Sequence, residues 1–172
     1  LNDMAEKWNV ILMFGAPGTG KGTQSAALGR LPGFHHVDMG EILRSMGADT
    51  DEGREAQSYM GRGELLPDEL VVSIWKHAIA DQEAAGVIQR GRDVLILDGI
   101  PRTVGQARML AEEIEPLVLL DLTATDNEQL RARIERRAAA HQRLDDLYRE
   151  AINKRFKIYE RERPALLEFY PE

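Results

Sequence analysis

The 172-residue chain contains no cysteine, which excludes a disulfide framework and any zinc site built on thiolate ligands. Long hydrophobic runs are also missing: every apolar stretch is far shorter than the ~18 residues that a membrane span needs. Residues 1–7 lack the apolar core of a secretory signal. Basic residues are outnumbered, 22 against 29 acidic ones, so the formal net charge is -7 and a nucleic-acid-coating surface is not expected. We therefore expect a cytoplasmic protein with neither membrane nor nucleic acid as a partner.

Internal repeats, low-complexity tracts and Pro/Ser-rich linkers are absent as well, so the chain is expected to be one unit with insertions. Four apolar runs, at 10–14, 34–37, 94–97 and 117–122, have the character of buried strands, and helical patterns lie between them. Alternating strands and helices predict an α/β fold: three layers, with a parallel sheet covered by helices on both faces. In such a sheet, functional residues gather at the carboxyl ends of the strands.

The first apolar run leads directly into a glycine-rich loop and the start of a helix, which indicates a phosphate-binding loop. Glycines allow successive backbone N–H groups to point at one anion, and the helix that follows adds the positive end of its dipole. Lys21 supplies a full charge, while the hydroxyl of the general motif comes one place late, at Thr23. The loop residues expected to surround the phosphates of a bound nucleotide are Gly15, Ala16, Pro17, Gly18, Thr19, Gly20, Lys21, Gly22, Thr23 and Gln24.

This decapeptide, Gly-Ala-Pro-Gly-Thr-Gly-Lys-Gly-Thr-Gln, resembles the nucleoside monophosphate kinases, and the adenylate kinases above all. The resemblance implies a P-loop NTPase fold, ATP as co-substrate, Mg²⁺, and a nucleoside monophosphate as acceptor. It also implies a core at 8–38, 71–130 and 144–172 within a single kinase domain spanning 1–172, a monophosphate-binding flap at about 39–70, and a short lid at about 131–143.

A second stretch, 38–44, resembles the segment with which these kinases hold the acceptor phosphate, Arg44 forking onto it in a way that lysine could not. Met39 and Glu41 depart from the usual Thr and Asp. Further on, the backbone of 63–66 and the apolar walls Leu65 and Leu66 are expected beside the acceptor base. The resemblance implies these AMP-binding residues: Met39, Gly40, Arg44, Glu64, Leu65, Leu66, Gly99, Arg102, Gln106, Arg143 and Arg155.

The third strand ends in Asp98, and a strand-end carboxylate beside a phosphate loop can hold the water shell of Mg²⁺, with Thr23 as a possible second ligand. Gln106 lies four residues after Arg102, and its amide can form paired hydrogen bonds with an adenine edge. Pyrimidine-specific relatives usually carry Asn at the positions of Thr103 and Gln106, so adenine is favoured. No metal-ligand spacing links the four histidines, and we assign them no role.

An arginine-rich helix follows the fourth strand, with Arg133 and Arg137 on one face where they could grip ATP together. The lid proper, 138–142, is too short for a zinc site. By resemblance, the catalytic cations are Lys21, Arg102, Arg137, Arg143 and Arg155. The resemblance covers about residues 10–170, and family members usually continue into one more strand and a helix. The fourth strand is therefore expected to be an unprotected edge; a monomer is the default and association through that edge the alternative.

These expectations combine into one reaction, ATP + AMP = 2 ADP, by in-line transfer without a covalent intermediate. Two alternatives stay open: transfer to CMP or UMP, suggested by Met39, and a nucleotide-binding module with little turnover, suggested by the substitutions at Met39 and Glu41 and by the missing strand.

Overall fold

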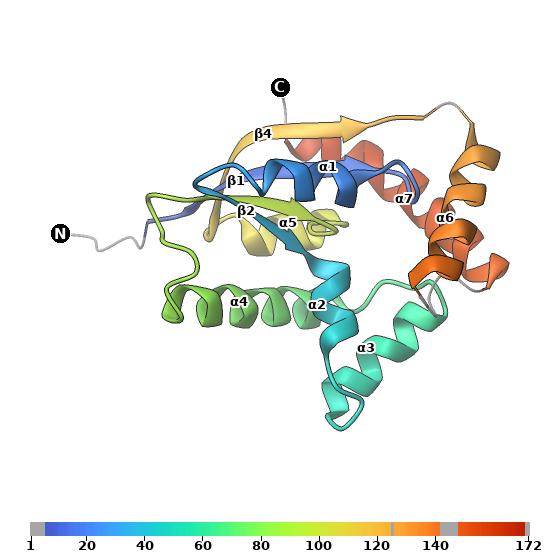
Figure 1. The fold of residues 1–172 in the computed structure, drawn as a ribbon, viewed down its shortest axis with the longest axis horizontal. Coiled ribbons are helices and arrows are strands. Elements are labelled where there is room, and N and C mark those ends of the chain that lie inside the picture. Colours follow the sequence, from blue (N-terminus) through green and yellow to red (C-terminus); the bar gives the residue numbers. More distant parts are fainter. Residues whose placement is uncertain (1–5, 125, 142–147, 171–172) are drawn as a thin grey trace.

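The computed structural model describes residues 6–124, 126–141 and 148–170, and strands alternate with helices along most of this length (Figure 1). The strands are β1 (Trp8–Gly15), β2 (Phe34–Asp38), β3 (Val94–Asp98) and β4 (Ile114–Leu122). The helices are α1 (Lys21–Leu28), α2 (Met39–Ser45), α3 (Asp51–Gly61), α4 (Asp68–Ala84), α5 (Val104–Leu110), α6 (Asn127–His141) and α7 (Arg149–Phe169).

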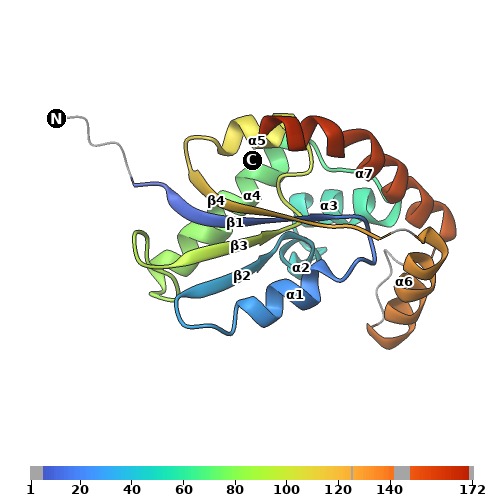
Figure 2. The same cartoon turned by 90° about the horizontal axis from the view of Figure 1, so that it is seen from above.

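The four strands form one parallel sheet in the order β2-β3-β1-β4. β1 lies between β3 and β4, with Val10 opposite Leu95 and Leu12 opposite Leu97, and all four of these side chains are fully buried. Helix α1 packs against β1, β2 and β3, while α5 contacts α4 and α7 (Figure 2). The expected three-layer α/β architecture of the P-loop NTPase type is therefore confirmed. Its physical basis is that the apolar strands of a parallel sheet need helices over both faces.

Strand β4 is an edge strand, since among the described residues it pairs only with β1. It begins at Ile114, three places before the predicted start, and its register shifts directly after Pro116: Val10 pairs with Pro116, but Ile11 pairs with Val118. Proline has no N–H to give to the ladder, which explains an irregularity there. Leu117 and Val118 remain 54% and 46% exposed, so an apolar sheet edge faces outward as expected.

Most buried side chains belong to one hydrophobic core that joins the sheet to α2, α4, α5 and α7. A second, smaller cluster contains Leu130 and Ile134 of α6 and Ile152 and Phe156 of α7, and Ala16 packs against it. This cluster fixes the two C-terminal helices next to the loop after β1. In the described part of the chain, no helix is long and apolar enough to cross a membrane.

Candidate active site

The loop after β1 has the conformation that its glycines allow. Gly18 and Gly20 lie at φ of 85° and 95°, in the left-handed region that side chains disfavour. A Cβ at Gly18 would come within 2.7 Å of the Leu130 carbonyl oxygen, so the glycine also lets α6 approach the loop closely. Lys21 opens α1 and its Nζ donates to the carbonyl oxygens of Gly15 at 2.8 Å and Ala16 at 3.2 Å. The loop thus curves around its own lysine.

Positive side chains from distant parts of the chain surround Lys21. Its pKa is lowered to about 8, first by burial and then by the charges of Arg102, Arg155 and Arg137, while Asp98 acts in the opposite direction. Arg102 follows β3 and donates through Nε to the carbonyl oxygen of Gly99 at 2.9 Å. Such a concentration of cations is suited to a polyanionic ligand.

A group of oxygen and nitrogen ligands lies at the carboxyl ends of β2 and β3. His36, Asp38 and Asp98 each place one possible ligand atom within 4.8 Å of the others. Asp98 is buried, yet its pKa is lowered: burial raises it, but His36, Lys21 and Arg102 together overcome that effect. A Cβ at Gly22 would lie 3.5 Å from Asp98 Oδ2, so the carboxylate faces the beginning of α1 near Thr23. This donor set, rich in carboxylate oxygens, fits a hydrated Mg²⁺ ion. Sequence reasoning missed His36 here because only the pairing of β2 with β3 brings it to Asp98.

Helix α2 begins where Asp38 accepts a hydrogen bond from the Glu41 backbone N–H at 3.0 Å. The same carboxylate lies 3.8 Å from the Arg44 guanidinium. A Cβ at Gly40 would meet Arg44 Nη1 at 3.0 Å and Asp38 Oδ1 at 3.1 Å, so this glycine leaves room for the pair. Arg44 is thereby held beside the carboxyl end of β2, where the acceptor phosphate is expected.

The segment after α3 contacts α7. Gly63 lies at φ 67° against the backbone of Ala151, and Lys154 bonds with the Glu64 carboxylate, which Arg62 also contacts. These hydrogen bonds lower the pKa of Glu64. Leu66 is buried and Leu65 half-buried. The 63–66 segment, which precedes Pro67, therefore forms one wall of a cleft.

Gln106, on the first turn of α5, is only 2% exposed and its amide is hydrogen-bonded at both ends. Oε1 accepts from the Arg102 backbone N–H at 2.7 Å, and Nε2 donates to Asp68 at 3.0 Å. Asp68 is the first residue of α4 and was not predicted; its only signal in the sequence is an acid after proline at a helix start.

One cleft collects many of the predicted residues, from the loop after β1, α2, the 63–66 segment, the end of β3, α5 and α7. Its lining includes Gly15, Pro17, Lys21, Met39, Gly40, Arg44, Glu64, Leu65, Leu66, Gly99, Arg102, Gln106 and Arg155. Tyr159 and Arg163 of α7 also line it and were not predicted. Both bond with Asp121 of β4, which ties α7 to the sheet.

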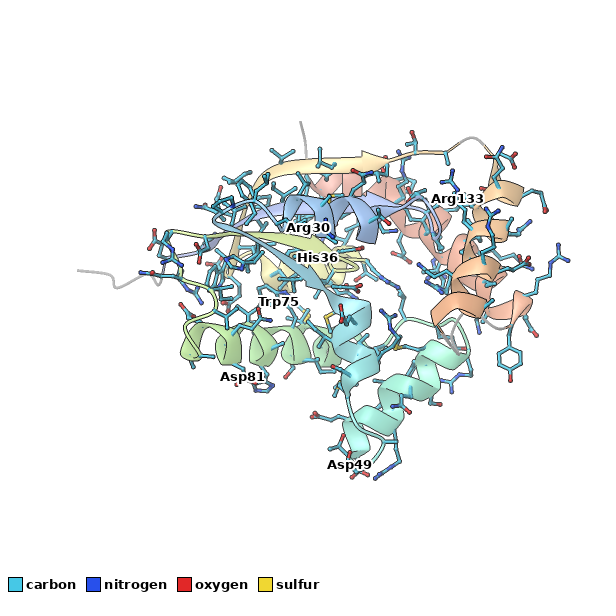
Figure 3. All side chains as sticks on the ribbon, viewed as in Figure 1. Arg30, His36, Asp49, Trp75, Asp81 and Arg133 are labelled. Carbon is cyan, nitrogen blue, oxygen red and sulfur yellow. The ribbon has the colours of Figure 1, made fainter. Side chains whose placement is uncertain are left out.

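The other predicted residues lie around this cleft or beyond the described chain. Ala16, Gly18, Thr19, Gly20 and Gly22 belong to the loop but do not line the cleft, and Thr23 and Gln24 are exposed on α1. On α6, Arg133 is exposed (Figure 3), whereas Arg137 is half-buried and close enough to lower the pKa of Lys21. Arg143 lies outside the described residues.

Comparison with known proteins agrees with this geometry. The family model for adenylate kinase matches residues 13–172. An adenylate kinase of Phocaeicola vulgatus is 37% identical over 167 residues, covering 93% of this chain and 83% of the relative. Those of Thermosynechococcus vestitus and Parabacteroides distasonis are 34% and 32% identical, with the same two coverages. The chain belongs to the adenylate kinase family, enzymes that transfer a phosphoryl group from ATP to a nucleoside monophosphate.

Proposed function

We propose that AMP is the preferred acceptor, so that the enzyme converts ATP and AMP into two ADP. The observation that carries this proposal is the position of Gln106: its amide lies in the same cleft as Arg44 and Arg102. A ligand that carries both a phosphate and an adenine matches a cleft that offers both cations and an amide.

For the donor, we propose that the loop at 15–24 surrounds the phosphates of ATP. Its backbone N–H groups and Lys21 would donate hydrogen bonds to the phosphate oxygens. Arg137, whose charge lowers the pKa of Lys21, would add a second positive charge. Arg133 lies one turn before Arg137 on α6 and is assigned the outer part of the nucleotide.

For the acceptor, we propose that Arg44, Arg102 and Arg155 bind the monophosphate, with Arg143 joining them. The pKa of Arg102 is lowered by lost hydration and by the charge of Arg155, while Asp98 and Asp38 act in the opposite direction. Leu65 and Leu66 would cover the base, and the buried Met39 offers it an apolar contact where a hydroxyl is usual. Gly40, Glu64 and Gly99 line the same space.

The chemistry needs alignment rather than a protein nucleophile. The acceptor phosphate attacks the γ-phosphorus of ATP in line, and the cations offset the repulsion between two anions as charge spreads in the transition state. Asp98, with Thr23 as a second candidate, would hold a hydrated Mg²⁺ ion, which would supply further neutralisation of the phosphate charge. We assign residues 39–70 to a flap and 131–143 to a short lid that exclude water, around a core of 8–38, 71–130 and 144–172.

A turnover assay with ATP and a panel of AMP, CMP, UMP and IMP tests the acceptor. AMP is expected to have the highest kcat/KM. Higher kcat/KM for CMP or UMP would replace AMP by a pyrimidine nucleotide as the acceptor, and absence of ADP formation with every monophosphate would favour a nucleotide-binding module.

A further inference from the structure

Asp68 lies behind Gln106 and does not line the cleft itself. Both of its carboxylate oxygens lie 2.9 Å from the Thr103 hydroxyl, and Oδ1 is 3.0 Å from Gln106 Nε2. A Cβ at Gly105 would overlap Oδ2, so α5 has a glycine where the carboxylate presses against it. The first turn of α4 is therefore fixed directly to the first turn of α5.

These contacts leave the Gln106 amide one orientation. An ionised carboxylate only accepts hydrogen bonds, and the Arg102 backbone N–H only donates, so Nε2 must face Asp68 and Oε1 must face Arg102. Rotation of the amide by half a turn would place oxygen against oxygen and N–H against N–H. With Gln106 only 2% exposed, water cannot replace the bonds that this rotation breaks.

The orientation matters because purines differ at the edge that an amide can contact. A 6-aminopurine has a donor at C6 and an acceptor at N1, whereas a 6-oxopurine has an acceptor at C6 and a donor at N1. Gln106 keeps one lone pair on Oε1 and one hydrogen on Nε2 for the ligand. An amide that rotates freely could therefore form paired hydrogen bonds with both purine classes, whereas a fixed amide can form them with one class only.

We propose that Asp68 is a positioning residue that restricts the acceptor to 6-aminopurine monophosphates by fixing the amide of Gln106. This inference rests on the proposed use of AMP as the acceptor. Thr103, which donates to Asp68 and also accepts from the Gln106 backbone N–H at 3.1 Å, holds the carboxylate in place. Part of the discrimination against IMP thus comes from a side chain that does not line the cleft, and the rest from the Arg102 backbone N–H.

The test is Asp68→Asn, since an asparagine of nearly the same shape can also donate to a rotated Gln106 amide. The substitution removes one of the two contacts that oppose rotation and leaves the other, the Arg102 backbone N–H, in place. The ratio of kcat/KM for AMP to that for IMP is expected to fall by roughly fivefold or more, the scale of one buried hydrogen-bond mismatch. The fall should come mainly from a lower KM for IMP, with the KM for ATP unchanged. Glu69→Gln is the matched control, because Glu69 is an exposed acid in the same helical turn, and it should keep the wild-type ratio.

Each result has a distinct meaning. A wild-type enzyme that prefers AMP, with an unchanged AMP-to-IMP ratio in Asp68→Asn, overturns the inference and leaves the proposed function intact. Equal losses for both nucleotides would also overturn it, because they would indicate only a structural role. A wild-type preference for CMP or UMP overturns the proposed function itself. If Asp68→Asn does not fold, Asp68→Ser has the same ability to accept or donate and the same expected loss of discrimination.

Discussion

Lys21 is the residue at which the positive charge of the cleft is concentrated. Its Nζ bonds with two loop carbonyls, and three arginines lie near enough to lower its pKa. A phosphate entering the loop would replace those carbonyls as the partner of the ammonium group. The full charge would then act where negative charge is transferred.

We expect Lys21→Met to lower kcat/KM by about 100- to 1000-fold, the usual effect of removing one donor from a transition state. Turnover of ATP and AMP in a coupled assay measures this loss. Lys76→Met is the control, because Lys76 is exposed on α4 and pairs with Glu113, and activity should stay within about twofold. A loss below about fivefold in Lys21→Met would show that the loop lysine does not contact the reacting phosphates.

Asp93, just before β3, is a second residue whose charge is important, this time for stability. It is 1% exposed and accepts hydrogen bonds from Arg92 and from the Gln89 backbone N–H. Its pKa is lowered from 3.8 to about 2, chiefly by the hydrogen bond from Arg92. The unfolded chain therefore takes up this proton at a higher pH than the folded one, and the stabilisation present above pH 4 disappears as the pH falls toward 2.

Asp93→Asn should accordingly lower the Tm at pH 7, and the difference from wild type should shrink between about pH 4 and 2. Thermal unfolding followed by circular dichroism at several pH values tests this. Asp81→Asn, an exposed position on α4, should change the Tm little at any pH. A constant difference for Asp93→Asn down to pH 2 would contradict the ionic origin.

The candidate site residues that the sequence predicted belong to local motifs. Lys21, Arg44, Arg102 and Gln106 each belong to a stretch with fixed spacing, and the cleft brings all four together. Asp68 was missed because it is 38 residues from Gln106 and acts only through the packing of α4 on α5. Spacing within one segment contains no information about such a pair.

The conformation of the 63–66 segment, which follows α3, depends on Gly63, where the chain turns toward the cleft and contacts α7. Its φ of 67° disfavours any side chain, and a Cβ would lie 2.8 Å from the Ala151 Cα and overlap the Ala151 carbonyl oxygen. The chain can make this turn against α7 only with glycine.

We expect Gly63→Ala to lower the free energy of unfolding by at least ~1–2 kcal/mol, the penalty of the left-handed conformation alone. Overlap with Ala151 adds to this, and the 63–66 segment should separate from α7. Urea unfolding measures the change. Gly61→Ala, at the end of α3 with nothing within 4 Å of its added Cβ, should be neutral or slightly stabilising. Equal stability of the two variants would mean that the contact with α7 is not formed in solution.

Element boundaries were predicted less well than element types. All four strands were placed correctly, because apolar runs between helical patterns are a strong signal. The start of β4 was placed too late, since Ile114 and the irregular Pro116 belong to the strand through pairing with β1. Residues 138–141, expected in the lid proper, continue α6 without a break. No turn signal in the sequence could show where that helix ends.

At the scale of the whole molecule, Lys21 of the loop after β1 and Arg44 of α2 line one cleft, and we propose that they bind the donor and the acceptor. Two adenosines joined through five phosphates would contact Lys21 and Arg44 at once. We expect this bisubstrate to raise the Tm more than ATP does at equal concentration, because it gains the contacts of both subsites and binds only the folded state. Differential scanning fluorimetry with each ligand tests the expectation. Equal shifts, with no ADP formed from ATP and AMP, would indicate a binding module instead of an active enzyme.

The central position of β1 has a consequence for biosynthesis. This strand is made well before its two neighbours in the sheet, β3 and β4, which lie on either side of it (Figure 2). Asn9 pairs with Val94 in β3, and Trp8 pairs with Ile114 in β4. As the chain leaves the ribosome, an apolar strand therefore emerges with both edges unpaired. Pairings this distant also make refolding slow, because long loops must close before the sheet gains any contacts. Strand β1 must thus wait for residues up to Leu122 before both of its sides are covered.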